Sequence, residues 1–164
     1  MSGRQPICVG GDVYKRQVLN PSPMNEKILS LPLEYVNYFM LNEVEAGQIL
    51  NRDTKNGFDG DALVEELVEK FPSAAVILTM GSAGAVYMDQ KEMIHQQVYK
   101  VKAVDTTAAG DTFTGFFIGG ILRGMDVKDA MEQASKAAAI AVTRRGAAPS
   151  IPTLPEVVSC DKTV

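Results

Sequence analysis

Residues 104–113, VDTTAAGDTF, place small side chains and an aspartate directly before an apolar run. If this segment is a strand end and a tight turn that lead into a helix, it brings the nearly bare backbone of Ala108, Ala109 and Gly110 to the helix N-terminus. Amide groups at that end have no partner within the helix, and together with the helix dipole they bind anions. One dipole contributes only about 0.3–1 kcal/mol at an exposed site, so several N–H bonds must act together. The segment therefore predicts a phosphate cradle.

Asp111 follows the cradle and has two interpretations. Aspartate is a favoured N-cap residue, so its side chain could simply cap the helix. Alternatively, it could take a proton from a hydroxyl group while the cradle holds a phosphoryl group in transfer. A carboxylate is a weak base at neutral pH and would act mainly through its placement, which is sufficient for a loose phosphoryl transfer.

Two further stretches carry residue types suited to phosphate chemistry. LNEVE, residues 41–45, sets Asn42 and Glu45 one helical turn apart, where a carboxylate can orient the water shell of Mg²⁺. The same spacing is also a helix capping box, and both interpretations can hold together. LTMGSAG, residues 78–84, is a glycine-containing strand turn, which taken alone is more often only a turn.

Together and in this order, the three stretches resemble motifs of the ribokinase-like carbohydrate kinase family. DTTAAGD, residues 105–111, is similar to the family pattern Asp-Thr-x-Gly/Ala-Ala-Gly-Asp, NEVE to Asn-x-x-Glu, and TMGSAG to Thr-x-Gly-x-x-Gly. The resemblance covers residues 18–152. It implies that Asp111 is the catalytic base and that the backbone of Ala108, Ala109 and Gly110 is the anion hole.

The resemblance also implies a set of ligands. ATP would donate the phosphoryl group, and Glu45 would hold Mg²⁺ through water. The nucleotide-binding positions would be Asn42, Thr79, Gly81, Gly84, Gly110 and Ser135, where Ser135 stands at a position at which family members often carry Asn. An activating K⁺ beside the anion hole would be bound by Asp105, Ser150 and the carbonyl groups of Thr107, Val142, Arg145 and Gly146.

Around these motifs, the hydrophobic pattern alternates between strand and helix. It predicts strands at 18–23, 34–41, 74–80 and 85–89 and within 93–104, and helices at 42–50, 61–71, 112–123 and 127–144. The alanines of the last helix favour close helix packing. This alternation indicates an α/β fold with a doubly wound, mostly parallel sheet, helices on both faces, and ligands at the carboxyl ends of the strands.

The composition limits the classes of function. A length of 164 residues suits one domain, and a net charge of −4 argues against a nucleic-acid surface. No apolar run approaches the roughly 20 residues that span a bilayer. Cys8 and Cys160 lie near opposite ends and His95 is the single histidine, which excludes a zinc site and a disulfide framework. We expect a cytoplasmic chain with small-molecule partners, without nucleic acid or membrane.

The resemblance divides the chain into an atypical segment at 1–17, the C-terminal nucleotide-binding part of a kinase domain at 18–155, and a tail at 156–164. The N-terminal half of a family member carries the sugar-binding acid, a Gly-Gly motif and the lid, and Gly10–Gly11 lacks the context of that motif. We therefore expect a fold without that half and lid, and impaired transfer to sugar. A full-length family member would be a homodimer.

Several functions remain open at this point. The favoured one is ATP-dependent phosphorylation of a sugar hydroxyl, with ribose as the acceptor. A kinase of the same family for fructose, ketodeoxygluconate or a nucleoside is a second possibility. A third is a nucleotide-binding remnant or interaction module without turnover, and a fourth is a doubly wound domain whose motifs are only caps and turns.

Overall fold

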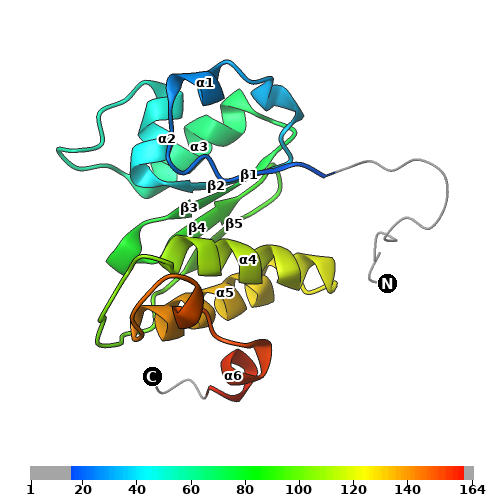
Figure 1. Cartoon of the computed structure of the whole chain (residues 1–164). Helices are drawn as coiled ribbons and strands as arrows, with labels where there is room; N and C mark the ends of the chain where they lie inside the picture. Colours follow the sequence, from blue (N-terminus) through cyan, green and yellow to red (C-terminus); the bar gives the residue numbers. More distant parts are fainter. Residues whose placement is uncertain (1–15, 161–164) are drawn as a thin grey trace.

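A five-stranded mixed sheet forms the centre of the computed structural model, which describes residues 16–160 (Figure 1). Cys8 and Gly10–Gly11 lie outside the described residues. The strands follow one another across the sheet in chain order, with β1, β2 and β3 parallel and β4 antiparallel to both of its neighbours. Their bounds are Val18–Leu19 (β1), Tyr38–Asn42 (β2), Ala75–Thr79 (β3), Ala85–Met88 (β4) and Met93–Gln96 (β5).

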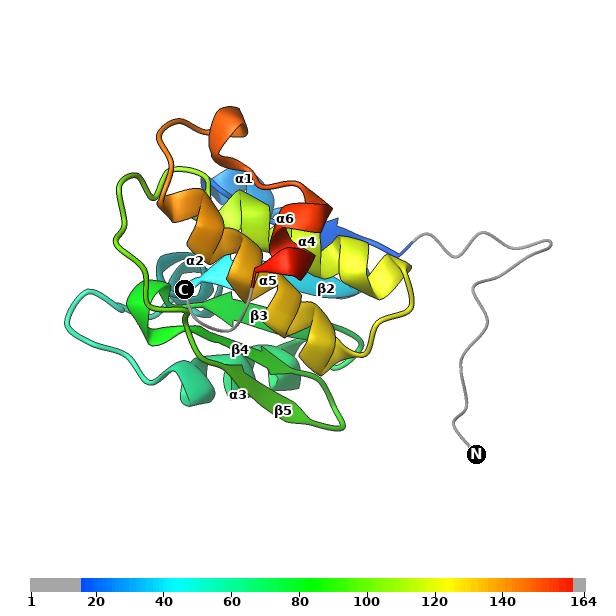
Figure 2. The same cartoon turned by 90° about the horizontal axis from the view of Figure 1, so that it is seen from below.

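Helices cover both faces of this sheet, as a doubly wound α/β fold requires. Figure 1 shows α1, α2 and α3 on one side and α4, α5 and α6 on the other, and Figure 2 shows α4 and α5 running across the sheet. The predicted fold class is therefore confirmed. The helices are α1 (Glu26–Leu29), α2 (Glu43–Leu50), α3 (Gly60–Lys70), α4 (Ala109–Leu122), α5 (Val127–Val142) and α6 (Leu154–Ser159), with 3-10 turns at Leu33–Tyr35, Gly81–Ala83 and Ala148–Ser150.

Each face of the sheet has its own hydrophobic core, because successive strand side chains point to opposite faces. In β2, Phe39 and Leu41 pack with α2 and α3, whereas Met40 packs with α4 and α5. The ring of Phe39 lies 4.8 Å from that of Phe71 in the first core, and Phe117 anchors the second. The strand that ends at Asn42 is thus fixed from both sides.

Small residues let α4 and α5 pack closely on one face. A Cβ added at Gly120 would lie 3.1 Å from Cβ of Ala130, and Ala130, Ala134 and Ala137 are fully buried. This contact confirms that the alanines of α5 serve close helix packing. It also fixes the helix whose first turn carries the predicted cradle.

Several predicted boundaries are wrong. The strand predicted at 18–23 ends at Leu19, before prolines that cannot donate to a ladder, and the helix predicted at 127–144 ends at Val142. Residues 33–35 form a 3-10 turn, in which the amides of Tyr35 and Val36 bind carbonyl groups three residues earlier, so β2 begins only at Tyr38. Residues 97–104 form no strand, because the amide of Val104 binds the Val142 carbonyl at the end of α5. Helix α4 begins at Ala109 rather than at residue 112.

The two ends of the folded part show two further features. The predicted boundary between the kinase part and the tail, at residue 155, falls inside helix α6, which runs from Leu154 to Ser159. Between residues 16 and 160, none of the helices combines the length and the apolar character needed to cross a membrane.

Replacing Thr112 by Val should raise the free energy of unfolding by about 1 kcal/mol, because the buried Thr112 Oγ1 has no hydrogen-bond partner among residues 16–160. Ser150→Ala is the matched control, because the equally buried Ser150 hydroxyl donates to the Ala147 carbonyl at 2.7 Å. That change should lower the free energy of unfolding by about 1 kcal/mol. Urea unfolding measures both changes in the free energy of unfolding. A lower value for Thr112→Val would show that the Thr112 hydroxyl of the parent chain has a hydrogen-bond partner in solution.

Candidate active site

A cavity of about 240 Å³ opens where the parallel strands end and α4 begins. Asn20, Asn42 and Thr79 stand at or directly after the carboxyl ends of β1, β2 and β3. Such an edge is the usual ligand site of an open α/β sheet. The cavity brings residues of all three sequence motifs together, and its lining is Asn20, Ser22, Met40, Leu41, Asn42, Glu45, Thr79, Thr107, Gly110, Asp111 and Thr114.

The first turn of α4 leaves amide groups without protein acceptors. Ala108 stands at the N-cap position and has no side chain that could cap the helix. The amides of Ala108, Gly110 and Asp111 donate no hydrogen bond to any residue in the described range 16–160. The Ala109 amide differs, since it donates to the Thr106 carbonyl at 3.2 Å. The predicted cradle is therefore present as backbone, with the Ala109 amide already engaged.

Asp111 is the third residue of α4 and not its N-cap. The interpretation of Asp111 as a simple cap is therefore wrong, because the helix begins three residues earlier than that role requires. Its side chain is exposed, lines the cavity and accepts no hydrogen bond from the described residues. A carboxylate in the first turn is favoured by the helix dipole, and here it stands beside the amides of the cradle.

Asn42 and Glu45 form the predicted capping box at the start of α2. The Asn42 Oδ1 accepts the Glu45 amide at 2.9 Å, and the Glu45 Oε2 accepts the Asn42 amide at 2.9 Å. Glu45 is only 5% exposed, and its Oε1 has no partner among residues 16–160. The capping box thus holds a buried carboxylate at the cavity wall with one oxygen left for a ligand.

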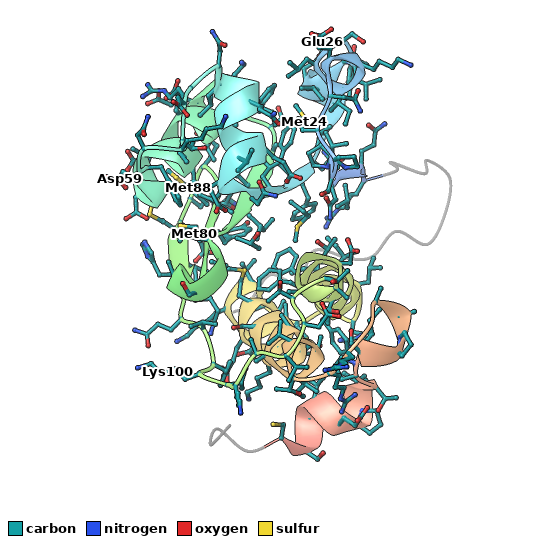
Figure 3. The ribbon with its side chains drawn as sticks, turned by 60° about the vertical axis from the view of Figure 1, so that its left-hand side comes forward. Met24, Glu26, Asp59, Met80, Met88 and Lys100 are labelled. Atoms are coloured by element: carbon teal, nitrogen blue, oxygen red, sulfur yellow. The ribbon has the colours of Figure 1, made fainter. Side chains whose placement is uncertain are left out.

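The glycine turn after β3 is fixed by a hydrogen bond at Thr79 and by a close backbone contact at Gly84. Thr79 lines the cavity and donates its hydroxyl to the Leu41 carbonyl at 3.3 Å, whereas Gly81 and Gly84 lie outside the lining. Gly84 has a φ of 96°, and a Cβ there would overlap the Gln96 carbonyl oxygen, so only glycine fits. Met80 packs against Gly60 at the start of α3, and Figure 3 shows Met80 on the same flank as Asp59.

Asp105 ties the approach to α4 to the loop that follows α5. Its Oδ1 accepts the hydroxyl and the amide of Thr107, at 2.5 and 3.0 Å, and its Oδ2 accepts the Gly146 amide at 3.0 Å. These hydrogen bonds lower the pKa of Asp105 to about 2. The Thr107 hydroxyl makes the largest contribution, and the Gly146 and Thr107 amides add to it. The carboxylate therefore stays ionised and holds the cradle against the end of α5.

The remaining predicted residues stand apart from the cavity lining. The Val142 carbonyl accepts the amides of Val104 and Asp105, at 2.7 and 3.1 Å, which uses both of its lone pairs. Ser150 is buried and donates its hydroxyl to the Ala147 carbonyl, whereas Arg145 is exposed. Ser135, in α5, donates its hydroxyl to the Gln97 carbonyl at 3.2 Å. These residues frame the loops beside α4 and α5.

Sequence reasoning missed Asn20, Ser22 and Thr114, which line the same cavity. The Asn20 Nδ2 donates to the Thr114 Oγ1 at 3.4 Å, and its Oδ1 accepts the Ser22 amide at 3.3 Å. Asn20 directly follows β1, so the rule that polar groups after parallel strands meet at one edge could have found it. Thr114 lies three residues after Asp111, on the same helix face.

Known proteins resemble this chain in sequence and in fold. Residues 7–154 match the profile of the pfkB family carbohydrate kinases. The chain is 43% identical over 148 residues to the ribokinase of Schizosaccharomyces pombe, which covers 85% of this chain and 45% of that protein. The structure of ribokinase from Cryptococcus neoformans var. grubii in complex with ADP superposes with a TM-score of 0.78 and 30% identity, over 87% of this chain and 51% of that one.

A second solved structure contains two bound ligands. Ribokinase of Arabidopsis thaliana, complexed with ribose and ATP, superposes with a TM-score of 0.69 and 27% identity, over 77% of this chain and 41% of that one. The chain thus spans about half the length of the relatives it matches.

The hydrogen bonds of Asp105 predict an acid-sensitive link between α4 and α5. Because the pKa of Asp105 is lowered to about 2, its contribution to stability is complete above the unfolded value of about 4 and is lost as the pH falls toward 2. The difference in the free energy of unfolding between the parent chain and Asp105→Asn should be constant from pH 7 to 5 and shrink between about pH 4 and 2.

Urea unfolding over this pH range measures that difference. Glu69→Gln is the control, because Glu69 is an exposed acid of α3 without a side-chain partner in the range 16–160. Equal pH dependence of the two variants would mean that Asp105 does not hold the loops together.

Proposed function

The chain belongs to the pfkB family of carbohydrate kinases, and from this premise we propose that its cavity is a phosphoryl-transfer site. The reaction would be the ATP-dependent phosphorylation of a sugar hydroxyl, with ribose as the favoured acceptor. Support comes from the ribokinases that resemble this chain, one bound to ADP and another to ribose and ATP.

One observation carries the proposal. Backbone amides without protein acceptors, the exposed carboxylate of Asp111 and the uncommitted Glu45 Oε1 line or border a single cavity. The amides suit the oxygens of a transferring phosphoryl group, and the carboxylate suits the proton of an attacking hydroxyl group. Amide donors, a base and a buried carboxylate are the groups that this reaction needs close together.

Each residue would then have a role. The amides of Ala108, Gly110 and Asp111 would hold the γ-phosphate, and the Asp111 carboxylate would orient the sugar hydroxyl and take its proton. The Glu45 Oε1 would hold water molecules of Mg²⁺, and the metal would neutralise charge on the phosphates. Asn42 and Thr79 would contact the phosphates, while Gly81, Gly84 and Ser135 would shape the nucleotide site farther from the cavity.

The groups that position the sugar are proposed to lie in the half of the relatives that this chain does not match. Without them, the advantage of a fixed nucleophile is lost, which can amount to about 7–11 kcal/mol of the barrier. The 164-residue chain would therefore bind nucleotide while transferring phosphate to ribose only slowly.

A monovalent cation site beside the cradle is part of the same proposal. Asp105, Ser150 and the carbonyl groups of Thr107, Arg145 and Gly146 offer the oxygen ligands that K⁺ prefers, whereas the Val142 carbonyl is occupied by two amides. A bound K⁺ would fix the turn that presents the amides of the cradle.

Mg²⁺-ADP should bind several-fold more tightly in K⁺ than in tetramethylammonium at the same ionic strength, and Asp105→Asn should abolish the difference. Isothermal titration calorimetry measures both affinities. Equal affinities of the parent chain in the two cations would remove K⁺ from the proposal.

Replacing Asp111 by Asn should leave the affinity for Mg²⁺-ADP within about a factor of two and lower ribose-dependent ADP formation by about 10²–10⁴, the usual effect of losing a positioned base. Asp129→Asn is the matched control, because Asp129 is the third residue of α5 as Asp111 is of α4. It removes a carboxylate from the same place in a helix, outside the cavity, and should retain turnover.

A coupled assay at high protein concentration measures turnover, and calorimetry measures binding. If Asp111→Asn and Asp129→Asn turn over equally, Asp111 is not the base. If the parent chain does not bind Mg²⁺-ADP, the proposed function is wrong.

A further inference from the structure

A second cavity, of about 310 Å³, lies at the opposite edge of the sheet from the candidate active site. It opens where β2 and β3 begin and where the antiparallel β4 ends. Its lining shares no residue with the lining of the first cavity. A ligand bound in one cavity would therefore contact different residues from a ligand bound in the other.

Two aromatic side chains, Tyr38 and Tyr87, line this cavity. Both belong to the core on the α4 side, where each ring centroid lies 6.4 Å from that of Phe117. Tyr87 is only 3% exposed. Packing against Phe117 holds the two rings in place, so this part of the cavity is preformed.

The acidic side chain in the cavity is already committed to hydrogen bonds. Asp89 Oδ1 accepts the amides of Lys91 and Glu92, at 2.8 and 3.0 Å, and Oδ2 accepts the Tyr87 hydroxyl at 3.0 Å. Burial and this carboxylate raise the pKa of Tyr87 well above its ordinary value, so its hydroxyl remains a donor to Asp89. Little of the acceptor capacity of Asp89 is left for a ligand, and its negative charge is outweighed by the positive charges of Arg16 and Lys91 in the same lining.

The cationic side chains of the cavity are not committed in this way. Arg16 and Lys91 both line it, and within residues 16–160 neither forms an ion pair with an acidic side chain. Ser73 also lines the cavity, and its hydroxyl has no hydrogen-bond partner in the same range. The groups still available to a ligand are thus a guanidinium, an ammonium and a hydroxyl, which together favour an anion.

We propose that this second cavity binds a small organic anion. Its phosphate or carboxylate group would contact Arg16 and Lys91, and its body would lie against Tyr38. The volume lies at the lower end of the range usual for ligand cavities, so the ligand is a small one. The proposal does not depend on the kinase function, since it rests on residues at the other edge of the sheet.

Phenyl phosphate is a suitable probe, because it joins an anionic group to an aromatic ring. We expect a titration followed by ¹⁵N NMR at constant ionic strength to give saturable shifts of the amides of Ser73, Ala75 and Gln90. Inorganic phosphate should shift the same amides with several-fold lower affinity, because it lacks the ring. The double variant Arg16→Gln, Lys91→Gln should weaken phenyl phosphate binding by at least about tenfold.

Lys27→Gln, Lys55→Gln is the control, because it removes the same charge from two exposed positions outside the cavity. It should retain the affinity of the parent chain. All four substitutions are at exposed residues, and the amide spectrum itself reports whether each variant is folded. Two results would overturn the proposal: shifts confined to Ala108, Gly110 and Asp111, or equal weakening in the two double variants.

Discussion

The arrangement of the candidate site depends on the open N-terminus of α4. At the starts of α1, α2, α3 and α5, side chains of Asn25, Asn42, Asp59 and Asp126 accept hydrogen bonds from the first turn. Ala108 stands at the equivalent position of α4 and offers no such acceptor. Such a cap is worth about 0.5–2 kcal/mol, so its absence costs stability and leaves amides available for an anion.

The rest of the fold places this helix end opposite the ends of the strands. Asp105 links the turn before α4 to the loop after α5, and the contact of Gly120 with Ala130 sets the spacing of the two helices. On the other face of the sheet, α2 and α3 fix β2, which ends at Asn42, and the first turn of α2 presents Glu45. The exposed Asp111 carboxylate and the amides at the start of α4 therefore lie at one cavity with the buried Glu45 carboxylate, which is distant from them in the sequence.

Much of this arrangement was predictable from the sequence. The alternation of strand and helix gave the fold class, and the rule that ligands bind at the carboxyl ends of strands explains why Asn42 and Thr79 meet Asp111. The start of α4 was not predictable, because small residues such as Ala109 and Gly110 show no hydrophobic period. Polar and apolar side chains alternate over residues 97–104 as they do in a strand. The segment is instead fixed by hydrogen bonds to Val142 and Ser135 of α5, which are distant in the sequence.

We propose that the uncapped amides of α4 receive the phosphoryl group in transfer. A crystal structure of the chain with Mg²⁺, ADP and aluminium fluoride would test it most directly, because aluminium fluoride mimics the transferring group. Fluoride should lie within hydrogen-bond distance of the amides of Gly110 and Asp111, with the Asp111 carboxylate facing it. A nucleotide bound with its terminal phosphate elsewhere, and these amides still without a partner, would show that they do not bind the phosphoryl group.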